Sequence, residues 1–236
     1  NYTDVMVESM VKDALIRLNP AIAEEPSRAD EVIYKLRALI MSTDENNLIT
    51  QNEAFKRFVF EQNSFPFGKD GRAISVSFFG TEQNGMLDKN EYVVTNQWVY
   101  PKKENGKRFD IVLLINGLPV AIGELKTPVR AAITWLDGAE DITSYEKSVP
   151  EMFATNIFVF ATEGKCYRYG AVGMPVNMWG PWHTAENKNE GSLAEVQISM
   201  ADMIQPYRVM DIFEFFTLFA PDKKHRKYKI ICRYQQ

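Results

Sequence analysis

The sequence predicts an α/β protein with a mixed central sheet flanked by helices. The first observation is a pair of apolar runs, 111–115 and 119–125, close to Asn116-Gly117, the dipeptide most typical of a tight turn between strands. The second is an N-terminal third in which apolar residues recur with the helical period. The third is the order of the later elements, strand, strand, helix and strand, which a mixed sheet satisfies most economically.

The composition supports a real core and excludes several classes of protein. The chain has 236 residues, 45% of them hydrophobic, which suffices for one large domain or two small ones. A net charge of −4 argues against a uniformly basic nucleic-acid coat, and no apolar run approaches the ~18 residues of a membrane span. Cys166 and Cys232 lack CxxC spacing, which argues against a zinc site or a disulfide framework and favours the reducing cytoplasm.

Residues 1–70 are expected to form a helical part. Thr3 is a candidate N-cap for the first helix, and Pro26 or Ser27 starts the second. A third helix is expected to begin with the capping box TQNE at 50–53. In this motif the threonine and glutamate side chains satisfy each other's free backbone donors. Three helices are therefore predicted before the first strand.

Residues 71–175 are expected to hold the sheet and one flanking helix. Runs rich in Val, Phe, Tyr and Thr at 73–79 and 92–100 predict two strands in the same sheet as the apolar hairpin. A further pair of strands is predicted at 156–162 and 166–172, around a Glu-Gly-Lys turn. Together with the hairpin, these strands would build the mixed sheet.

The flanking helix is expected directly after the second hairpin strand. Thr127 supplies an N-cap, and Pro128 is a residue type that the first helical position favours. Gly138 is expected to interrupt this helix, which then resumes and ends at Pro150. Such a helix would start beside the end of the hairpin and cover the sheet next to it.

Residues 176–236 begin with an irregular segment and continue with helices at 192–203 and 206–219. The chain then closes on a strand at 227–234. A basic run from Lys223 to Lys229 precedes and enters this strand. Such a run is either a contact for nucleic acid or a solvated loop, and the sequence leaves both interpretations open.

Three charged residues, Asp110, Glu124 and Lys126, lie at the ends of the apolar hairpin strands. A carboxylate in a buried strand is costly unless something pairs with it. Mg²⁺ typically binds one or two carboxylates and keeps several waters. The carboxylates of Asp110 and Glu124, together with the backbone carbonyl oxygen of Leu125, suit it as ligands. The ion would lower the pKa of a bound water, and Lys126 would orient the hydroxide or offset growing negative charge. The pattern predicts metal-assisted phosphodiester hydrolysis.

This metal site requires an irregularity in the hairpin. With a regular two-residue turn at Asn116-Gly117, Asp110 would face Gly123 and point away from Glu124. A three-residue loop that ends in a left-handed Gly117, or a bulge near Gly123, shifts the register by one residue and brings the two carboxylates onto one face. We therefore predict one of these irregularities.

The spacing of the three charges also fits an ordinary cross-strand ion pair. An aspartate followed by ExK within about fifteen residues occurs often by chance in a chain that is 25% charged. Burial favours the functional interpretation, because long apolar strands that carry charges only at their ends are uncommon without a function. On the residues alone, both interpretations stay open.

Several long segments carry a resemblance to a known family: ALIRLNP, RADEVIYKLRALI, NEAFKRFVFEQNSFPFG, YVVTNQWVY, RFDIVLLINGLPVAIGELKTP, SYEKSVPEMF and KIICRYQQ. They are similar to the N-terminal endonuclease region of the restriction (R) subunit of type I restriction-modification enzymes, and the similarity covers nearly the whole chain. It implies a restriction-endonuclease-like core with a PD-(D/E)xK signature. Asp110 and Glu124 would be the metal ligands and Lys126 the catalytic lysine, with Phe109 where the signature usually has proline.

A related motif, QxxxY on the following helix, is matched in part. Tyr145 matches its tyrosine, whereas Asp141 stands where the motif has glutamine. One helical turn separates the two residues, so they share a face. The resemblance implies a supporting or DNA-contacting role for this pair, and Lys107 and Arg108 are candidate phosphate contacts in a local basic cluster.

The resemblance also implies partners. In the full enzyme a helicase motor translocates DNA at the expense of ATP, a specificity subunit recognises the sequence, and modification (methyltransferase) subunits complete the complex. The nuclease then needs to hold only the phosphates of double-stranded DNA. The chain has no GxxxxGK[ST] frame, so we expect 1–236 to be an endonuclease domain fragment without the ATP site, with a leading helix and the motor outside it.

Two functions from different classes are therefore considered. The first is a Mg²⁺-dependent endonuclease of double-stranded DNA. The second is a non-catalytic coupling or assembly module that keeps the nuclease fold and helps to dock the motor. Substitution of Glu124 or Lys126 separates them, because only a catalytic site would lose DNA cleavage while the motor still hydrolyses ATP.

Overall fold

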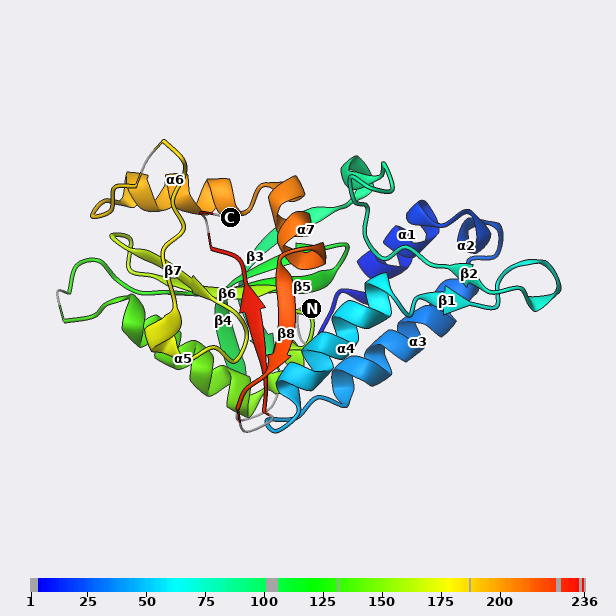
Figure 1. The fold of residues 1–236 in the computed structure, drawn as a ribbon, viewed down its shortest axis with the longest axis horizontal. Helices are drawn as coiled ribbons and strands as arrows, with labels where there is room; N and C mark the ends of the chain where they lie inside the picture. The colour runs from blue at the N-terminus through cyan, green and yellow to red at the C-terminus, as the bar shows by residue number, and fades with distance from the viewer. Residues whose placement is uncertain are drawn as a thin grey trace.

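The core of the protein is a five-stranded mixed sheet (Figure 1). A computed structural model of the chain describes residues 4–100, 106–130, 132–186, 188–223, 226–233 and 235. The strands lie across the sheet in chain order, as β3 (Tyr92–Tyr100), β4 (Lys107–Ile115), β5 (Leu118–Leu125), β6 (Phe158–Thr162) and β7 (Tyr167–Gly170). β5 and β6 are parallel, and the other neighbours are antiparallel. The predicted α/β class with a mixed central sheet is confirmed.

Four helices precede the sheet: α1 (Glu8–Leu18), α2 (Pro20–Glu24), α3 (Arg28–Met41) and α4 (Leu48–Phe60). In Figure 1 they lie together at one end of the molecule. The start of α3 directly after Ser27 is confirmed, whereas α2 was not predicted. The start of α4 is a correction, because this helix begins at Leu48 and includes the expected capping box at 50–53. The cap expected at Thr3 lies outside the described residues.

Residues 73–79 do not join the central sheet, contrary to the prediction. Only β2 (Ile74–Ser75) forms a strand there, and it pairs with β1 (Ser64–Phe65) in a separate two-stranded sheet. Farther along, a side chain replaces the missing strand partner. The buried Asn19 accepts a hydrogen bond from the backbone N–H of Ser77 at 2.7 Å and donates one to its carbonyl oxygen at 2.8 Å. The prediction for 92–100 is confirmed as β3.

The helix beside the hairpin, α5 (Trp135–Ser148), begins later than predicted. Its N-cap is Thr134, within a capping box, while residues 127–128 lie outside any helix. Gly138 does not interrupt the helix. A Cβ atom at this glycine would lie 3.2 Å from the Cβ atom of Ala161 in β6, so the absence of a side chain lets α5 pack closely on the sheet.

Two helices and a two-stranded ribbon complete the chain: α6 (Leu193–Met203), α7 (Pro206–Glu214), β8 (Thr217–Pro221) and β9 (Lys227–Ile231). Figure 1 shows α6 and α5 on opposite sides of the sheet. The predictions of α6 and β9 are confirmed. The helix predicted to reach 219 ends at Glu214, because the following residues pair with β9 in an antiparallel ribbon.

The basic run that ends at Lys229 is partly internal. The Lys229 side chain is buried and donates to the backbone carbonyl oxygen of Asn156 at 2.7 Å. Lys227 forms an ion pair with Glu53 of α4. Residues 224–225 lie outside the described part of the chain. The interpretation as a solvated loop is therefore wrong for Lys229, and a contact between this run and DNA stays a prediction.

Glu146, on the buried side of α5, links stability to pH. Its Oε1 atom accepts a hydrogen bond from the backbone N–H of Gly173 at 2.9 Å, and burial raises the pKa of its carboxyl group to about 7. The folded protein thus binds this proton more tightly than the unfolded chain does. The stabilisation is complete below the ordinary pKa of about 4.5 and is lost as the pH rises to about 7.

The variant Glu146→Gln, which cannot ionise, is expected to be more stable than the wild type above pH 7, by at most about 3 kcal/mol. The two proteins should converge near pH 4. Urea unfolding across this range measures the difference. Glu140→Gln, at an exposed position of the same helix, is the matched control and should leave the pH dependence unchanged. A constant difference between Glu146→Gln and wild type from pH 4 to 8 would contradict the raised pKa.

Candidate active site

The turn of the β4–β5 hairpin is regular. Ile115 pairs with Leu118, which leaves Asn116 and Gly117 as a strict two-residue turn. Both turn residues are left-handed, with φ of 52° and 80°, as the mirror-image turns of tight hairpins require. The predicted alternative of a three-residue loop is therefore wrong.

A bulge in β5 supplies the register shift that the site needs. Pro119 and Ala121 pair with successive residues of β4, so Val120 is an extra residue without a partner on that strand. Continued along the hairpin, the shifted register sets Asp110 opposite Glu124. The predicted irregularity is confirmed, although it lies nearer to the turn than expected.

The carboxylate of Asp110 reaches across to the end of β5. Its Oδ2 atom accepts a hydrogen bond from the backbone N–H of Leu125 at 3.0 Å. The register sets it opposite Glu124, where its negative charge contributes to raising the pKa of that carboxyl group. The two candidate metal ligands therefore come together at one end of the hairpin, as the sequence predicted.

Glu124 is buried and only half satisfied. Its Oε1 atom accepts a hydrogen bond from the ammonium group of Lys126 at 3.2 Å, whereas its Oε2 atom has no hydrogen-bond partner in the described structure. Burial, and then the charge of Asp110, raise the pKa of Glu124 to about 7 despite Lys126. A buried carboxylate oxygen without a partner costs free energy, so this atom is the place where a cation would be stabilising.

Lys126 lies between two carboxylates. Besides Glu124, its Nζ atom contacts Oδ2 of Asp141, which α5 places beside the end of β5. Burial lowers the pKa of Lys126, but the bonds to Asp141 and Glu124 outweigh burial and raise it above its ordinary value. The lysine is therefore a fixed positive charge. The sequence predicted a supporting or DNA-contacting role for Asp141, and the structure adds its contact with Lys126.

Tyr145 lies one turn after Asp141 on α5 and packs against β4. Its ring meets that of Phe109 edge to face with 5.5 Å between centroids, and the Lys107 ammonium lies 5.6 Å from its ring centroid. Arg108 is exposed on β4. The structure thus brings Lys107 and Tyr145 together at the hairpin, while contacts of these residues with DNA stay predictions.

The donors around Glu124 suit a hard divalent cation that keeps much of its water. Within the described ranges, no three His, Cys, Asp or Glu side chains gather closely enough to hold a metal ion by themselves. Asp110 and Glu124 offer two carboxylates, and the backbone carbonyl of Leu125 lies between Glu124 and Lys126 in sequence. Mg²⁺ typically binds one or two carboxylates and retains several waters, so this sparse oxygen set fits it.

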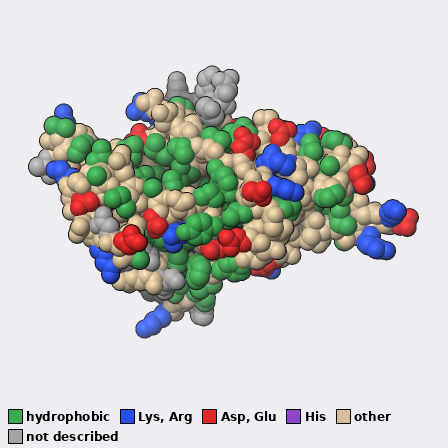
Figure 2. Space-filling view, turned by 90° about the horizontal axis from the view of Figure 1, so that it is seen from above, with side chains coloured by type: hydrophobic (Ala, Val, Ile, Leu, Met, Phe, Trp, Pro, Cys, Tyr) green, Lys and Arg blue, Asp and Glu red, His purple; other side chains and the backbone are tan. Residues whose placement is uncertain are grey.

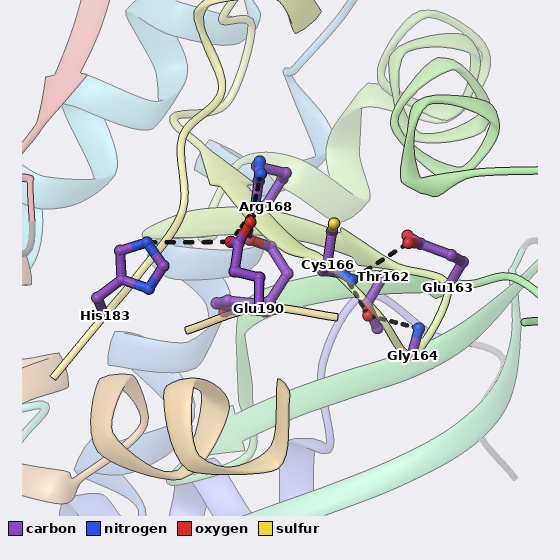
Figure 3. A network of polar contacts seen from close by, with 8 residues as sticks. Thr162, Glu163, Gly164, Cys166, Arg168, His183 and Glu190 are labelled. Carbon is purple, nitrogen blue, oxygen red and sulfur yellow. Dashed lines mark hydrogen bonds and ion pairs between the residues drawn. The ribbon is translucent and has the colours of Figure 1, made fainter. Parts of the chain in front are cut away.

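A second polar network lies at the β6–β7 edge of the sheet (Figure 3). Arg168 of β7 binds the carboxylate of Glu190, with Nη2 to Oε2 at 2.9 Å, and stacks over the ring of Trp135, the first residue of α5. At the end of β6, Oε1 of Glu163 accepts the backbone N–H of Cys166 at 3.1 Å. The turn from Glu163 to Cys166 lies where the sequence predicted a turn, whereas the pair of Arg168 and Glu190 joins distant segments and had no signal in the sequence.

Comparison with known families now adds to this geometry. Residues 1–175 match the family described as "Type I restriction enzyme R protein N terminus", and this range contains every residue of the candidate site named above. The chain belongs to this family. The resemblance seen in the sequence is thereby confirmed.

Curated relatives of this R-protein N-terminal chain carry consistent names. The whole chain aligns at 26% identity with the type I restriction enzyme HindI endonuclease subunit of Haemophilus influenzae and covers 22% of it. It aligns at 25% identity with the putative MjaIXP endonuclease subunit of Methanocaldococcus jannaschii and covers 23% of that protein. The R-protein chain thus spans roughly a fifth of the length of these relatives.

None of the helices that the structure describes is long and apolar enough to cross a membrane.

Proposed function

We propose that this R-protein chain carries the nuclease site of a type I restriction enzyme and hydrolyses phosphodiester bonds of double-stranded DNA with Mg²⁺. The observation that carries the proposal is the buried, unpartnered Oε2 atom of Glu124, beside Asp110 and next to a fixed lysine ammonium. Glu163 also has a buried, unpartnered Oε2 atom, but the facing carboxylate of Asp110 and the ammonium of Lys126 distinguish Glu124 from it. The PD-(D/E)xK spacing of Asp110, Glu124 and Lys126 agrees with this chemistry.

In this proposal Asp110 and Glu124 hold the ion, with the Leu125 carbonyl as a third oxygen. A bound divalent ion supplies a Lewis acid, which lowers the pKa of water and stabilises charge on a phosphate oxygen. The Lys126 ammonium offsets the negative charge that grows on the phosphate in the transition state. Lys107, Arg108 and Tyr145 face the DNA backbone, which they hold without reading its sequence.

The longer relatives suggest how the site is supplied with DNA. The names of these relatives describe endonuclease subunits, and this chain matches only a fraction of their length. We propose that its full-length protein contains a motor that uses ATP and assembles with specificity and modification subunits. The same proposal places it in the cytoplasm, where its free thiols, Cys166 and Cys232, would stay reduced.

Binding of a divalent ion tests the metal site directly. Mn²⁺ is titrated into the chain, and free Mn²⁺ is followed by its electron paramagnetic resonance signal. Glu124→Gln is expected to weaken binding at least about tenfold, because the amide keeps the volume but removes the charge that the ion needs. Glu163→Gln is the matched control, since Glu163 is another buried glutamate with an unpartnered Oε2, at the end of the adjacent strand. Equal weakening by both variants would contradict a metal site at Glu124.

A further inference from the structure

The ammonium of Lys126 lies where it competes with a metal ion. It bonds Oε1 of Glu124 at 3.2 Å and, on its other side, the carboxylate of Asp141. A divalent ion on Glu124 would repel this ammonium at short range, and the repulsion would be strong because the side chains of Lys126 and Glu124 are only 20% and 7% exposed. For the ion to bind well, Lys126 needs a second hydrogen-bond acceptor that draws it away from Glu124.

Asp141 has the position and the solvation for that role. Its side chain is 44% exposed, compared with 7% for Glu124, so its ionised form loses much less hydration. It comes from α5, which is fixed against the hairpin. A Cβ atom at Gly138, one turn earlier on the same helix, would lie 3.5 Å from the Cβ of Glu124. The distance between the carboxylates of Asp141 and Glu124 is therefore set by the close packing of α5 on the hairpin.

We propose that Asp141 is a positioning residue for Lys126, which holds the ammonium to one side so that Glu124 can bind the divalent ion. The inference rests on the proposed function, because it assumes that a metal binds at Glu124. The family motif has glutamine at this position, whose side-chain oxygen can accept the same hydrogen bond, and the aspartate of this chain holds an ammonium more strongly than that neutral amide does.

A double-mutant cycle tests whether Asp141 acts through Lys126. Mn²⁺ affinity is measured for the wild-type chain, Asp141→Asn, Lys126→Gln and the double variant. Asp141→Asn alone is expected to weaken binding about five- to tenfold, because Lys126 then pairs only with Glu124 and competes with the ion. In the Lys126→Gln background the same substitution should change the affinity less than about twofold, because the competitor is gone.

Two control variants test whether the effect depends on a carboxylate at position 141. Asp141→Glu keeps the carboxylate and should bind Mn²⁺ within about twofold of the wild type. Glu140→Gln removes the same charge from an exposed neighbouring position on α5 and should also have little effect. Loss of affinity in Glu140→Gln equal to that in Asp141→Asn would overturn the proposal in favour of a general effect of charge.

The remaining outcomes are also decisive. If Asp141→Asn weakens Mn²⁺ binding equally with and without Lys126, Asp141 acts on the metal directly and the positioning role is refuted. If Asp141→Asn leaves wild-type affinity unchanged, the role is refuted while the metal site stands. Absence of Mn²⁺ binding to the wild-type chain would instead overturn the proposed metal site itself, and this inference with it.

Discussion

Glu124→Ala and Lys126→Ala are each expected to abolish DNA cleavage by the full-length R protein in its proposed complex, with ATP hydrolysis unchanged. Alanine at 124 removes a buried carboxylate of the proposed metal site, and alanine at 126 removes the fixed positive charge beside it. Loss of one such electrostatic group lowers the rate by at least about 100-fold. Conversion of supercoiled plasmid to linear DNA measures cleavage, and release of inorganic phosphate measures ATP hydrolysis by the proposed motor.

Glu163→Gln serves as the control for these variants, because it changes a buried glutamate outside the proposed site. It should cleave DNA as the wild type does. Thermal melts should show that the alanine variants are folded, so that loss of cleavage reflects chemistry. Full cleavage by folded Glu124→Ala and Lys126→Ala would refute the catalytic assignment and leave the second candidate, a coupling module that keeps the nuclease fold.

The hairpin shows what sequence pattern can predict and where tertiary contacts take over. The Asn-Gly dipeptide predicted the tight turn, and the chemistry of the site required a register shift. The position of the bulge depends on partners far along the chain. Thr155 and Asn156 donate side-chain hydrogen bonds to the carbonyl oxygen of Pro119. The backbone N–H of Ile157 donates a hydrogen bond to the carbonyl oxygen of Val120 at 2.6 Å. No local sequence pattern in β5 predicts these hydrogen bonds.

Capping boxes illustrate the same limit in the helices. The pattern of threonine followed three residues later by an acid occurs at both 50–53 and 134–137, and only the second starts a helix. At the first, Glu53 pairs instead with Lys227 of the distant β9. Asn52 is buried and bonds three backbone carbonyl oxygens between 153 and 156. Tertiary contacts thus outweigh a cap worth about 1 kcal/mol.

The sequence predicted the three charged residues of the candidate site but not the second partner of its lysine. Asp110, Glu124 and Lys126 lie close in sequence on two strands, so alternation and turn geometry could place them. The ion pair between Lys126 and Asp141 depends on how closely α5 approaches β5. That approach follows from Gly138, which the sequence suggested as a break in the helix and which serves instead as a packing surface.

Asn116→Ala is expected to destabilise the protein by about 5 kcal/mol. The buried Asn116 side chain donates hydrogen bonds to Phe78 O and Asn90 Oδ1, and it accepts them from Glu91 N and Arg17 Nη2, at 2.8 to 3.1 Å. Each bond is worth about 1 kcal/mol, and alanine also loses the tolerance of asparagine for a left-handed φ. The melting temperature should fall by about 10–20 °C, as measured by calorimetry.

Asp70→Ala provides the matched control, because Asp70 is also left-handed, with φ of 56°, but exposed. It should cost about 1 kcal/mol, the conformational part alone. The difference between the two variants then isolates the hydrogen bonds that join the hairpin turn to α1 and to the segments around 78 and 90. A similar small cost for Asn116→Ala would mean that those bonds do not fix the turn. The register that sets Asp110 opposite Glu124 would then depend on the bulge at Val120 alone.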